Sequence, residues 1–182
     1  WTLRAFQKEN PAHELGCTSQ FGTIYGGKFY IVSKQEKDPG ATVTGSRLAV
    51  IDAKTMKVLK EFTKIGDSDG RSFLGVDEHT GYIGTSNGIF LYDIDKMEIG
   101  EKISGTENTS GSLYSAQIGT MIRVGDRVFA VHQKNGLLVI DAKTHTLETT
   151  ILKPEEHEGH GLGSIVLSKD GTIWASPTVE LT

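Results

Sequence analysis

The hydrophobic positions of the chain follow a repeat. Three segments place four apolar or aromatic residues directly before an aspartate: Leu48–Asp52, Ile89–Asp93 and Leu137–Asp141. The aspartates are 41 and 48 residues apart (52 to 93 and 93 to 141). After each aspartate, positions four, six and ten are apolar or histidine, whereas position eight is polar. This alternation has the period of a half-buried strand, so we expect strands over 56–62, 97–103 and 145–151.

Another strand is expected before each of these segments. Four aromatic residues each open a short stretch after a turn signal: Tyr30, Tyr82, Phe129 and Trp174. A further apolar stretch precedes each turn, so every unit consists of four short antiparallel strands. Because the four aromatics hold equivalent places in the repeat, we expect them in the core between units. A cage of rings around a ligand is the alternative.

Two motifs that look chemical are better explained as turns. The repeat aspartates Asp52, Asp93 and Asp141 each stand where a strand ends. Their carboxylates are expected to accept backbone N–H groups two or three residues further on. The segment Gly84–Gly88 spells the G-x-S-x-G motif of a nucleophile elbow, but it lies between two expected strands, and its Asn-Gly pair is a strong hairpin signal.

Four-stranded units that recur every 40 to 50 residues predict a β-propeller, in which stacking covers both faces of each blade. The expected blades span about residues 20–64, 70–104 and 116–152, with a partial blade at 162–182. The sequence therefore predicts an all-β chain with about three and a half blades, which form part of a seven-bladed ring. We expect either a longer polypeptide or a complementary half, such as a second copy, to complete that ring.

The composition of the chain argues against several classes of function. The chain has 182 residues, a formal net charge of −4 and no basic cluster, which argues against a nucleic-acid partner. No apolar run reaches the length of a membrane span. Its single cysteine, Cys17, excludes an internal disulfide framework and a metal site of several cysteines. Twenty-two glycines and only four prolines suit a chain that turns often.

The repeat resembles the YVTN repeat of YncE-like propellers. The residues that carry the resemblance are Val128–Ile151 and Gly163–Ser176, and Leu48–Phe62 and Tyr82–Ile103 are weaker copies. The first unit departs from the pattern, because 22 residues separate Tyr30 from Asp52. The resemblance implies a bacterial extracytoplasmic protein of the periplasm or cell surface, lipid-anchored through an upstream segment in some members. It also implies a binding role, such as the capture of a corrinoid beside an outer-membrane transporter.

Ligand-binding residues are expected in the loops that enter the innermost strands on one face of a propeller. These loops are Asn10–Gln20, Gly66–Ser72, Gly105–Ser115 and Lys153–Gly163. Arg71 lies at the mouth of such a strand, where a guanidinium would anchor an anionic ligand. Tyr114 is an aromatic residue outside the repeat register. His13 and His160 each begin the motif His-x-Leu-Gly, so they share one face or simply mark a repeated turn.

Metal binding is a weaker expectation. Asp67 and Asp69 begin a sequence that looks like a calcium loop, but Arg71 and Ser72 stand where an oxygen ligand and a glycine belong. His157 and His160 lie among carboxylates, with no third ligand identified. An inter-blade turn for the first segment and a solvated acidic loop for the second are the favoured explanations.

Two functions remain after these steps. The first is a non-enzymatic propeller that binds a small molecule or a protein, with no required cofactor. The second is an enzyme of lactonase-like or quinoprotein-like type with a metal at the central axis. The candidate residues for such a site are Asp67, Asp69, His157 and His160. The sequence favours the first, because it contains no convincing catalytic set.

Overall fold

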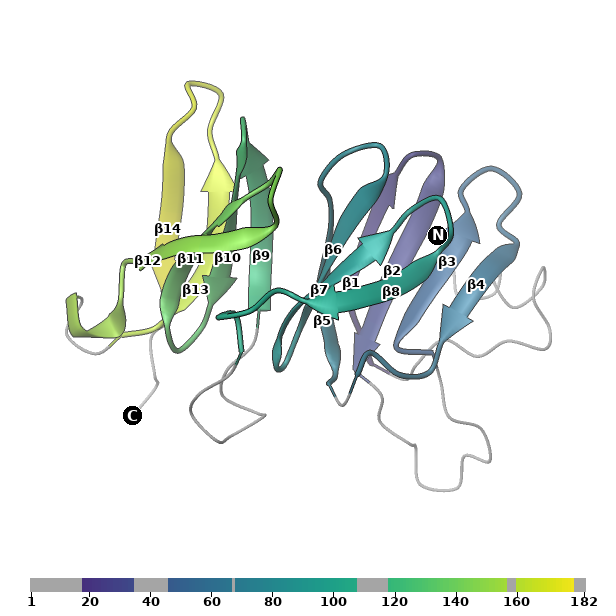
Figure 1. Cartoon of the computed structure of the whole chain (residues 1–182), viewed down its shortest axis with the longest axis horizontal. Coiled ribbons are helices and arrows are strands. Elements are labelled where there is room, and N and C mark those ends of the chain that lie inside the picture. Colours follow the sequence, from purple (N-terminus) through teal and green to yellow (C-terminus); the bar gives the residue numbers. More distant parts are fainter. Residues whose placement is uncertain (1–17, 35–45, 67, 108–117, 157–159, 179–182) are drawn as a thin grey trace.

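The computed structural model describes residues 18–34, 46–66, 68–107, 118–156 and 160–178. Within these ranges the chain forms strands and one short 3₁₀ helix, η1 (Pro154–Glu156). The predicted all-β class is confirmed. The strands form three antiparallel four-stranded sheets and one two-stranded sheet, which follow one another as blades in an open arrangement (Figure 1).

The strand order within each sheet follows the sequence. The first sheet holds β1 (Thr18–Tyr25), β2 (Lys28–Lys34), β3 (Leu48–Asp52) and β4 (Val58–Phe62). The second holds β5 (Gly70–Gly75), β6 (Thr80–Thr85), β7 (Gly88–Asp93) and β8 (Glu98–Lys102). The third holds β9 (Ile118–Val124), β10 (Arg127–His132), β11 (Gly136–Asp141) and β12 (Thr146–Ile151). The last pairs β13 (Leu162–Leu167) with β14 (Ile173–Pro177).

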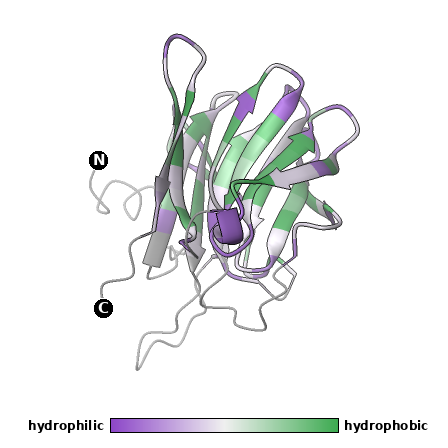
Figure 2. Ribbon diagram, turned by 90° about the vertical axis from the view of Figure 1, so that its left-hand side faces the viewer, coloured by the Kyte–Doolittle hydropathy of each residue, from purple (hydrophilic) through white to green (hydrophobic). Residues whose placement is uncertain are grey.

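The first strand of each sheet lies nearest to the neighbouring sheets. Strand β5 contacts both β1 and β9, and β9 also contacts β13. These four strands therefore form the inner side of the arrangement, and all of them run in the same direction (Figure 1). We call the end where they begin the entry face. Apolar residues concentrate in the strands and hydrophilic residues in the loops (Figure 2).

The core consists of apolar side chains between successive sheets. Tyr30 is fully buried at the first junction and stacks on Phe73 at a ring-centroid distance of 4.0 Å. Tyr82 is fully buried at the second junction, and Phe129 is partly buried at the third. The prediction of inter-blade core is thus confirmed for these positions. It is wrong for Trp174, which is 65% exposed because no sheet among the described residues packs beyond β14.

The repeat aspartates act as predicted at the strand ends. Asp52 Oδ1 accepts the backbone N–H groups of Lys54 at 3.0 Å and Thr55 at 2.6 Å. Asp93 and Asp141 accept the N–H groups two and three residues onward in the same way. The Thr55 N–H group holds the pKa of Asp52 below its usual value, and equivalent N–H groups lower the pKa of the other two aspartates.

The outermost strands begin later than the alternating pattern predicted. Met56, Met97 and His145 stand four residues after the aspartates, and each has a left-handed φ of 63°, 53° and 56°. The N–H groups of Met56 and His145 donate to the carbonyl oxygens of Asp52 and Asp141. These residues therefore close turns, and the prediction that they lie in strands is wrong. The strands follow one or two residues later.

Candidate functional site

The innermost strands carry irregularities near the entry face. In β1 the pairing with β2 shifts between Ser19 and Phe21, and in β5 the pairing with β6 shifts between Gly70 and Ser72. Strand β13 shifts in the same region, between Leu162 and Ser164. A β-bulge leaves one residue without a cross-strand partner and redirects its side chain. Gln20 and Arg71 are the residues at the first two shifts.

Arg71 lies at the junction of the first two blades. Its Nη1 donates to Gln20 Oε1 at 3.2 Å, and its Nη2 lies 3.6 Å from Asp69 Oδ2. The Arg71 side chain is 8% exposed. The predicted anchor for an anion is therefore positioned by an adjacent blade and by a carboxylate of its own loop.

A second guanidinium, which sequence reasoning missed, approaches the same carboxylate. Arg47 Nη2 lies 3.6 Å from Asp69 Oδ1, and Arg47 Nη1 donates to the Ser68 carbonyl oxygen at 2.5 Å. The backbone of Arg47 extends β3, since its carbonyl accepts the Ser33 N–H and its N–H donates to Phe62 O. Its Nε is buried without a hydrogen-bond partner in the described part of the chain.

The position of Arg47 in the repeat is itself a signal. It stands five residues before the aspartate of its unit, where the second and third units have Gly88 and Gly136. Both glycines have a left-handed φ, 101° and 110°. The first unit thus replaces a turn glycine with a long cationic side chain. A comparison of the units with one another would have found Arg47 from the sequence.

The loop that carries the shared carboxylate is fixed by the second blade. The Asp69 N–H donates to Ser86 Oγ at 3.0 Å, and the Ser86 N–H donates to the Asp69 carbonyl oxygen at 2.9 Å. Two guanidiniums therefore converge on one carboxylate. We call Arg47, Asp69 and Arg71 the arginine cluster. Such a preformed set of N–H donors suits a carboxylate or phosphate group.

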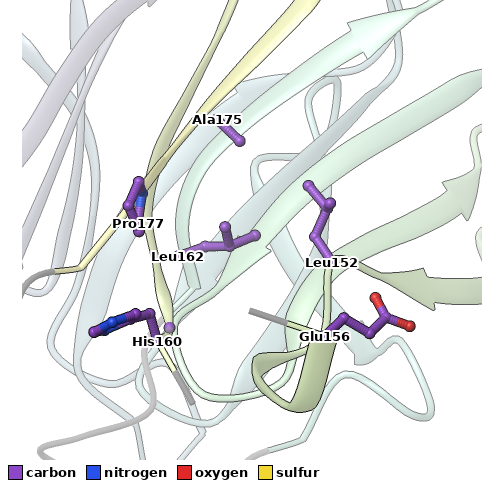
Figure 3. Close-up of a pocket in the computed structure, with 7 residues that line it drawn as sticks. Leu152, Glu156, His160, Leu162, Ala175 and Pro177 are labelled. Carbon is purple, nitrogen blue, oxygen red and sulfur yellow. The ribbon is translucent and has the colours of Figure 1, made fainter. Parts of the chain in front are cut away.

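His160 lies elsewhere on the entry face. It is exposed, and with Glu156 it lines a hollow of about 420 Å³ whose other walls are Leu152, Leu162 and residues of β14 (Figure 3). The sides of this hollow come from the third blade and from the two-stranded sheet. His160 and Arg71 therefore belong to different junctions.

Several sequence-predicted positions lie outside the described residues. They are His13, Asp67, Tyr114 and His157. Among the residues that the structure does describe, no three His, Cys, Asp or Glu side chains are grouped closely enough to hold a metal ion. Asp69, one of the metal candidates, faces the two guanidiniums of the arginine cluster.

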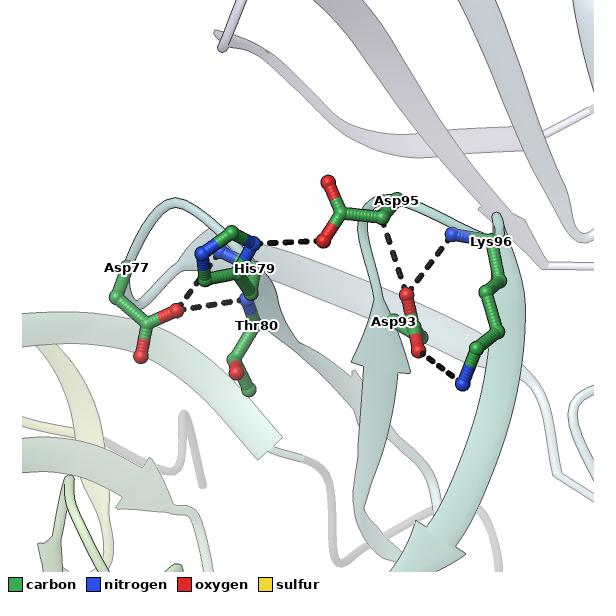
Figure 4. A network of polar contacts seen from close by, with 6 residues as sticks. All are labelled: Asp77, His79, Thr80, Asp93, Asp95 and Lys96. Atoms are coloured by element: carbon green, nitrogen blue, oxygen red, sulfur yellow. Dashed lines mark hydrogen bonds and ion pairs between the residues drawn. The ribbon is translucent and has the colours of Figure 1, made fainter.

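A polar network that was not predicted lies on the opposite face. His79 Nδ1 and Asp95 Oδ2 are 2.6 Å apart, which raises the pKa of His79 through the hydrogen bond and charge of Asp95 (Figure 4). Asp77 accepts the N–H groups of His79 and Thr80. The His79 and Asp95 side chains are 73% and 63% exposed, so this pair lacks the enclosure typical of a catalytic site.

A family model described as "Domain of unknown function (DUF5074)" matches residues 1–182. No curated protein matches the chain. Within the part of the chain that the structure describes, no helix is long and apolar enough to cross a membrane.

Solved structures share the fold at low sequence identity. The computationally designed Ika4 protein has a TM-score of 0.62 at 11% identity, with coverage of 91% of this chain and 95% of that one. Two extracellular domains from B. thetaiotaomicron also match. That of the one component system BT4673 has a TM-score of 0.67 at 13% identity and covers 93% of this chain. The extracellular domain of the hybrid two component system BT3049 has a TM-score of 0.62 at 16% identity and covers 94% of this chain. This chain spans about a fifth of each, 21% and 20% of their lengths.

Proposed function

Because the chain belongs to the DUF5074 family, whose description assigns no function, we propose one from its own residues. The protein is a non-enzymatic β-propeller domain that binds an anionic group of its ligand at Arg47 and Arg71. The observation that carries this proposal is the convergence of both guanidiniums on the single carboxylate of Asp69, 3.6 Å from each.

The two guanidiniums of the cluster support a ligand with a negative charge. A carboxylate or phosphate that approaches Arg47 and Arg71 would be attracted by both guanidiniums. It would also accept charge-assisted hydrogen bonds, which are stronger than neutral ones. Gln20 and the Ser68 carbonyl accept hydrogen bonds from the two guanidiniums, and Ser86 holds the backbone of Asp69. These bonds fix the cluster before binding, and a preorganised site loses less entropy when its ligand arrives.

The proposed location is the periplasm or the cell surface. The resemblance to YncE-like propellers and the two extracellular structural neighbours support it. A finer form of the proposal is capture of a small nutrient such as a corrinoid for an outer-membrane transporter. A corrinoid with a nucleotide loop carries a phosphodiester, which is the type of anion that a guanidinium pair recognises.

Isothermal titration with two named probes tests the proposal. Cyanocobalamin tests the corrinoid form, and inorganic pyrophosphate tests the broader affinity for anions. Arg47→Gln combined with Arg71→Gln should weaken binding of either probe at least about tenfold, because two charge-assisted contacts are lost. Arg127→Gln is the matched control, since Arg127 is paired with Glu148 at 2.7 Å on the outer part of the third blade.

Two results would contradict the proposal. If neither probe binds the unmodified chain, the arginine cluster is a structural bridge between blades. If the double variant binds as tightly as the control variant, the anion is bound elsewhere. Nε–Hε cross-peaks of Arg47 and Arg71 in an NMR titration with pyrophosphate would separate these cases, because only residues at the site should shift.

A further inference from the structure

A groove lies on the outer part of the first junction, between the first two blades. It has a volume of about 550 Å³, which is within the range of small-molecule sites. Its walls come from β4 and the residues that follow it, and from β7 and β8 of the next blade. The lining side chains that matter here are Lys60, Phe62, Lys64, Phe90, Glu98 and Ile99. We call this feature the outer groove.

The two aromatic rings of the outer groove are held by the core beneath them. Phe62 and Phe90 are partly buried, and both pack against the buried cluster of the first junction. The Phe62 ring meets the Tyr92 ring edge-to-face at a centroid distance of 6.1 Å. Gly66 has a left-handed φ of 55°, and a Cβ atom there would come within 2.9 Å of the Phe90 ring. The backbone therefore lies directly against that ring, so the groove is formed before a ligand arrives.

Lysine side chains reach these rings from both walls. Lys60 Nζ lies 5.8 Å from the centroid of the Phe62 ring, and Lys102 Nζ lies 5.6 Å from the centroid of the Phe90 ring. Both distances are typical of a cation–π interaction. An ammonium group has three N–H donors, so it can face a ring and still donate to an oxygen atom of a ligand. The outer groove thus places apolar rings and cationic donors side by side.

The second junction does not repeat this chemistry. At the four corresponding positions of the repeat, both rings become aliphatic side chains and both lysines become other polar residues. The corresponding residues are Glu101 for Lys60, Ile103 for Phe62, Leu138 for Phe90 and Thr150 for Lys102. The register is the same, because Leu138 pairs with Thr150 as Phe90 pairs with Lys102. Aliphatic residues therefore satisfy the packing of a junction, and the rings and lysines of the outer groove are a departure that packing does not require.

We propose that the outer groove binds a small organic anion with an aromatic ring, of the class of the aryl carboxylates. The ring of the ligand packs against Phe62 and Phe90, since aromatic rings attract one another in edge-to-face and offset arrangements. Its carboxylate accepts hydrogen bonds from Lys60 and Lys102, which are charge-assisted on both sides. Glu98 lines the same groove and repels an anion, so its charge limits the affinity.

Isothermal titration with 2-naphthoate at pH 7 tests the proposal. This probe is an aromatic carboxylate, and 2-naphthalenemethanol is its neutral counterpart of nearly the same shape. We expect 2-naphthoate to bind saturably and the alcohol to bind at least about threefold more weakly, because exposed charge pairs are worth up to about 1 kcal/mol each. Added sodium chloride should weaken the binding of 2-naphthoate and leave that of the alcohol unchanged, since salt screens charges at an open site.

Variants separate the contributions of charge and ring. Lys60→Met combined with Lys102→Met keeps the apolar stems and should weaken 2-naphthoate about three- to tenfold. Phe90→Leu introduces the residue that the third blade carries at this position, and it should weaken both probes about two- to tenfold. Glu98→Gln should strengthen 2-naphthoate about two- to fivefold. Lys143→Met is the matched control, because Lys143 is 70% exposed and paired with Asp126 at 2.7 Å on the third blade.

The outer groove and the arginine cluster share no residue, so their tests are independent. Arg47→Gln combined with Arg71→Gln should leave 2-naphthoate binding unchanged, and a loss of binding there would assign the anion to the arginine cluster and overturn the proposal. It is also overturned if 2-naphthoate does not bind, if the neutral alcohol binds as tightly, or if the lysine double variant binds like the control. A thermal melt confirms that each variant is folded, and the exposed change Glu98→Gln tests the site if Phe90→Leu unfolds the chain.

Discussion

Ile103 and Ile151 occupy the same position of the repeat in different surroundings, and this makes them a matched pair for mutation. Each isoleucine-to-alanine change removes three carbon atoms, worth about 0.8 kcal/mol each when fully buried, or about 2.4 kcal/mol together. Ile103 is 3% exposed at a closed junction, so a cavity term adds to this value. We expect Ile103→Ala to lower the free energy of unfolding by about 3–4 kcal/mol.

Ile151→Ala should cost much less. This side chain is 41% exposed, so about three-fifths of the transfer energy, about 1.4 kcal/mol, is lost, and an open face forms no enclosed cavity. Urea unfolding at 25 °C measures both values through the transition midpoints, provided that the slopes agree. Leu59→Ala is the control, since Leu59 is 42% exposed and also loses three carbons. A difference below about 0.5 kcal/mol between the two isoleucine variants would refute the view that the third junction is open.

Three further outcomes test the polar contacts. Tyr82→Phe should cost about 0.5–1.5 kcal/mol in urea unfolding, because the buried hydroxyl loses its 2.9 Å hydrogen bond to His145 Nδ1; an unchanged midpoint would contradict this. NMR titration should find the pKa of His79 above 6.5, and Asp95→Asn should bring it back; the stability from this pair is present below pH 6.5 and is lost as pH rises through the raised pKa. Burial lowers the pKa of His132, so its contribution is present above pH 6.5 and is lost as pH falls through the lowered pKa; His132→Asn should flatten that acid-side loss in melts between pH 7 and pH 5.

The strand content and the turns could be predicted because both depend on local chemistry. Period-two alternation determines which face of a strand is buried, and the repeat at Asp52, Asp93 and Asp141 identified equivalent strand ends. An aspartate at a strand end has few better partners than the next backbone N–H groups, so its role as a turn cap follows from residue type alone.

The start of the outermost strands could not be predicted in the same way. Met56, Met97 and His145 adopt left-handed φ values that usually select glycine or asparagine. Their side chains have no feature that predicts this conformation. The left-handed conformation results from closure of the aspartate turn, from pairing of the strand that follows, and from packing of the partly buried Met56 and Met97 against the core. The exposure of Trp174 could not be predicted from the repeat either, because burial at that position depends on whether a neighbouring sheet packs against it.

The candidate site was found in part. Arg71 was singled out because a cation stands at the mouth of an innermost strand, and the structure places it beside Gln20 and Asp69. Arg47 was missed because it lies within the long interval between Tyr30 and Asp52, which departs from the repeat, and it precedes Arg71 by 24 residues. The pairing of β2 with β3 in the folded chain places Arg47 at the first junction.

The positions where the chain departs from its own repeat are the ones that packing alone does not explain. A repeat position that serves folding alone is under the same packing demands in every blade, so its residue type should recur. Gly88 and Gly136 meet the demand of a left-handed turn, whereas Arg47 gives up that freedom and brings a charge to within 3.6 Å of Asp69. A partly buried guanidinium costs desolvation energy that a glycine at the same position of the repeat does not. An anionic ligand would accept charge-assisted hydrogen bonds from both guanidiniums, which is why the arginine cluster, and not the repeated aspartates, carries the functional proposal.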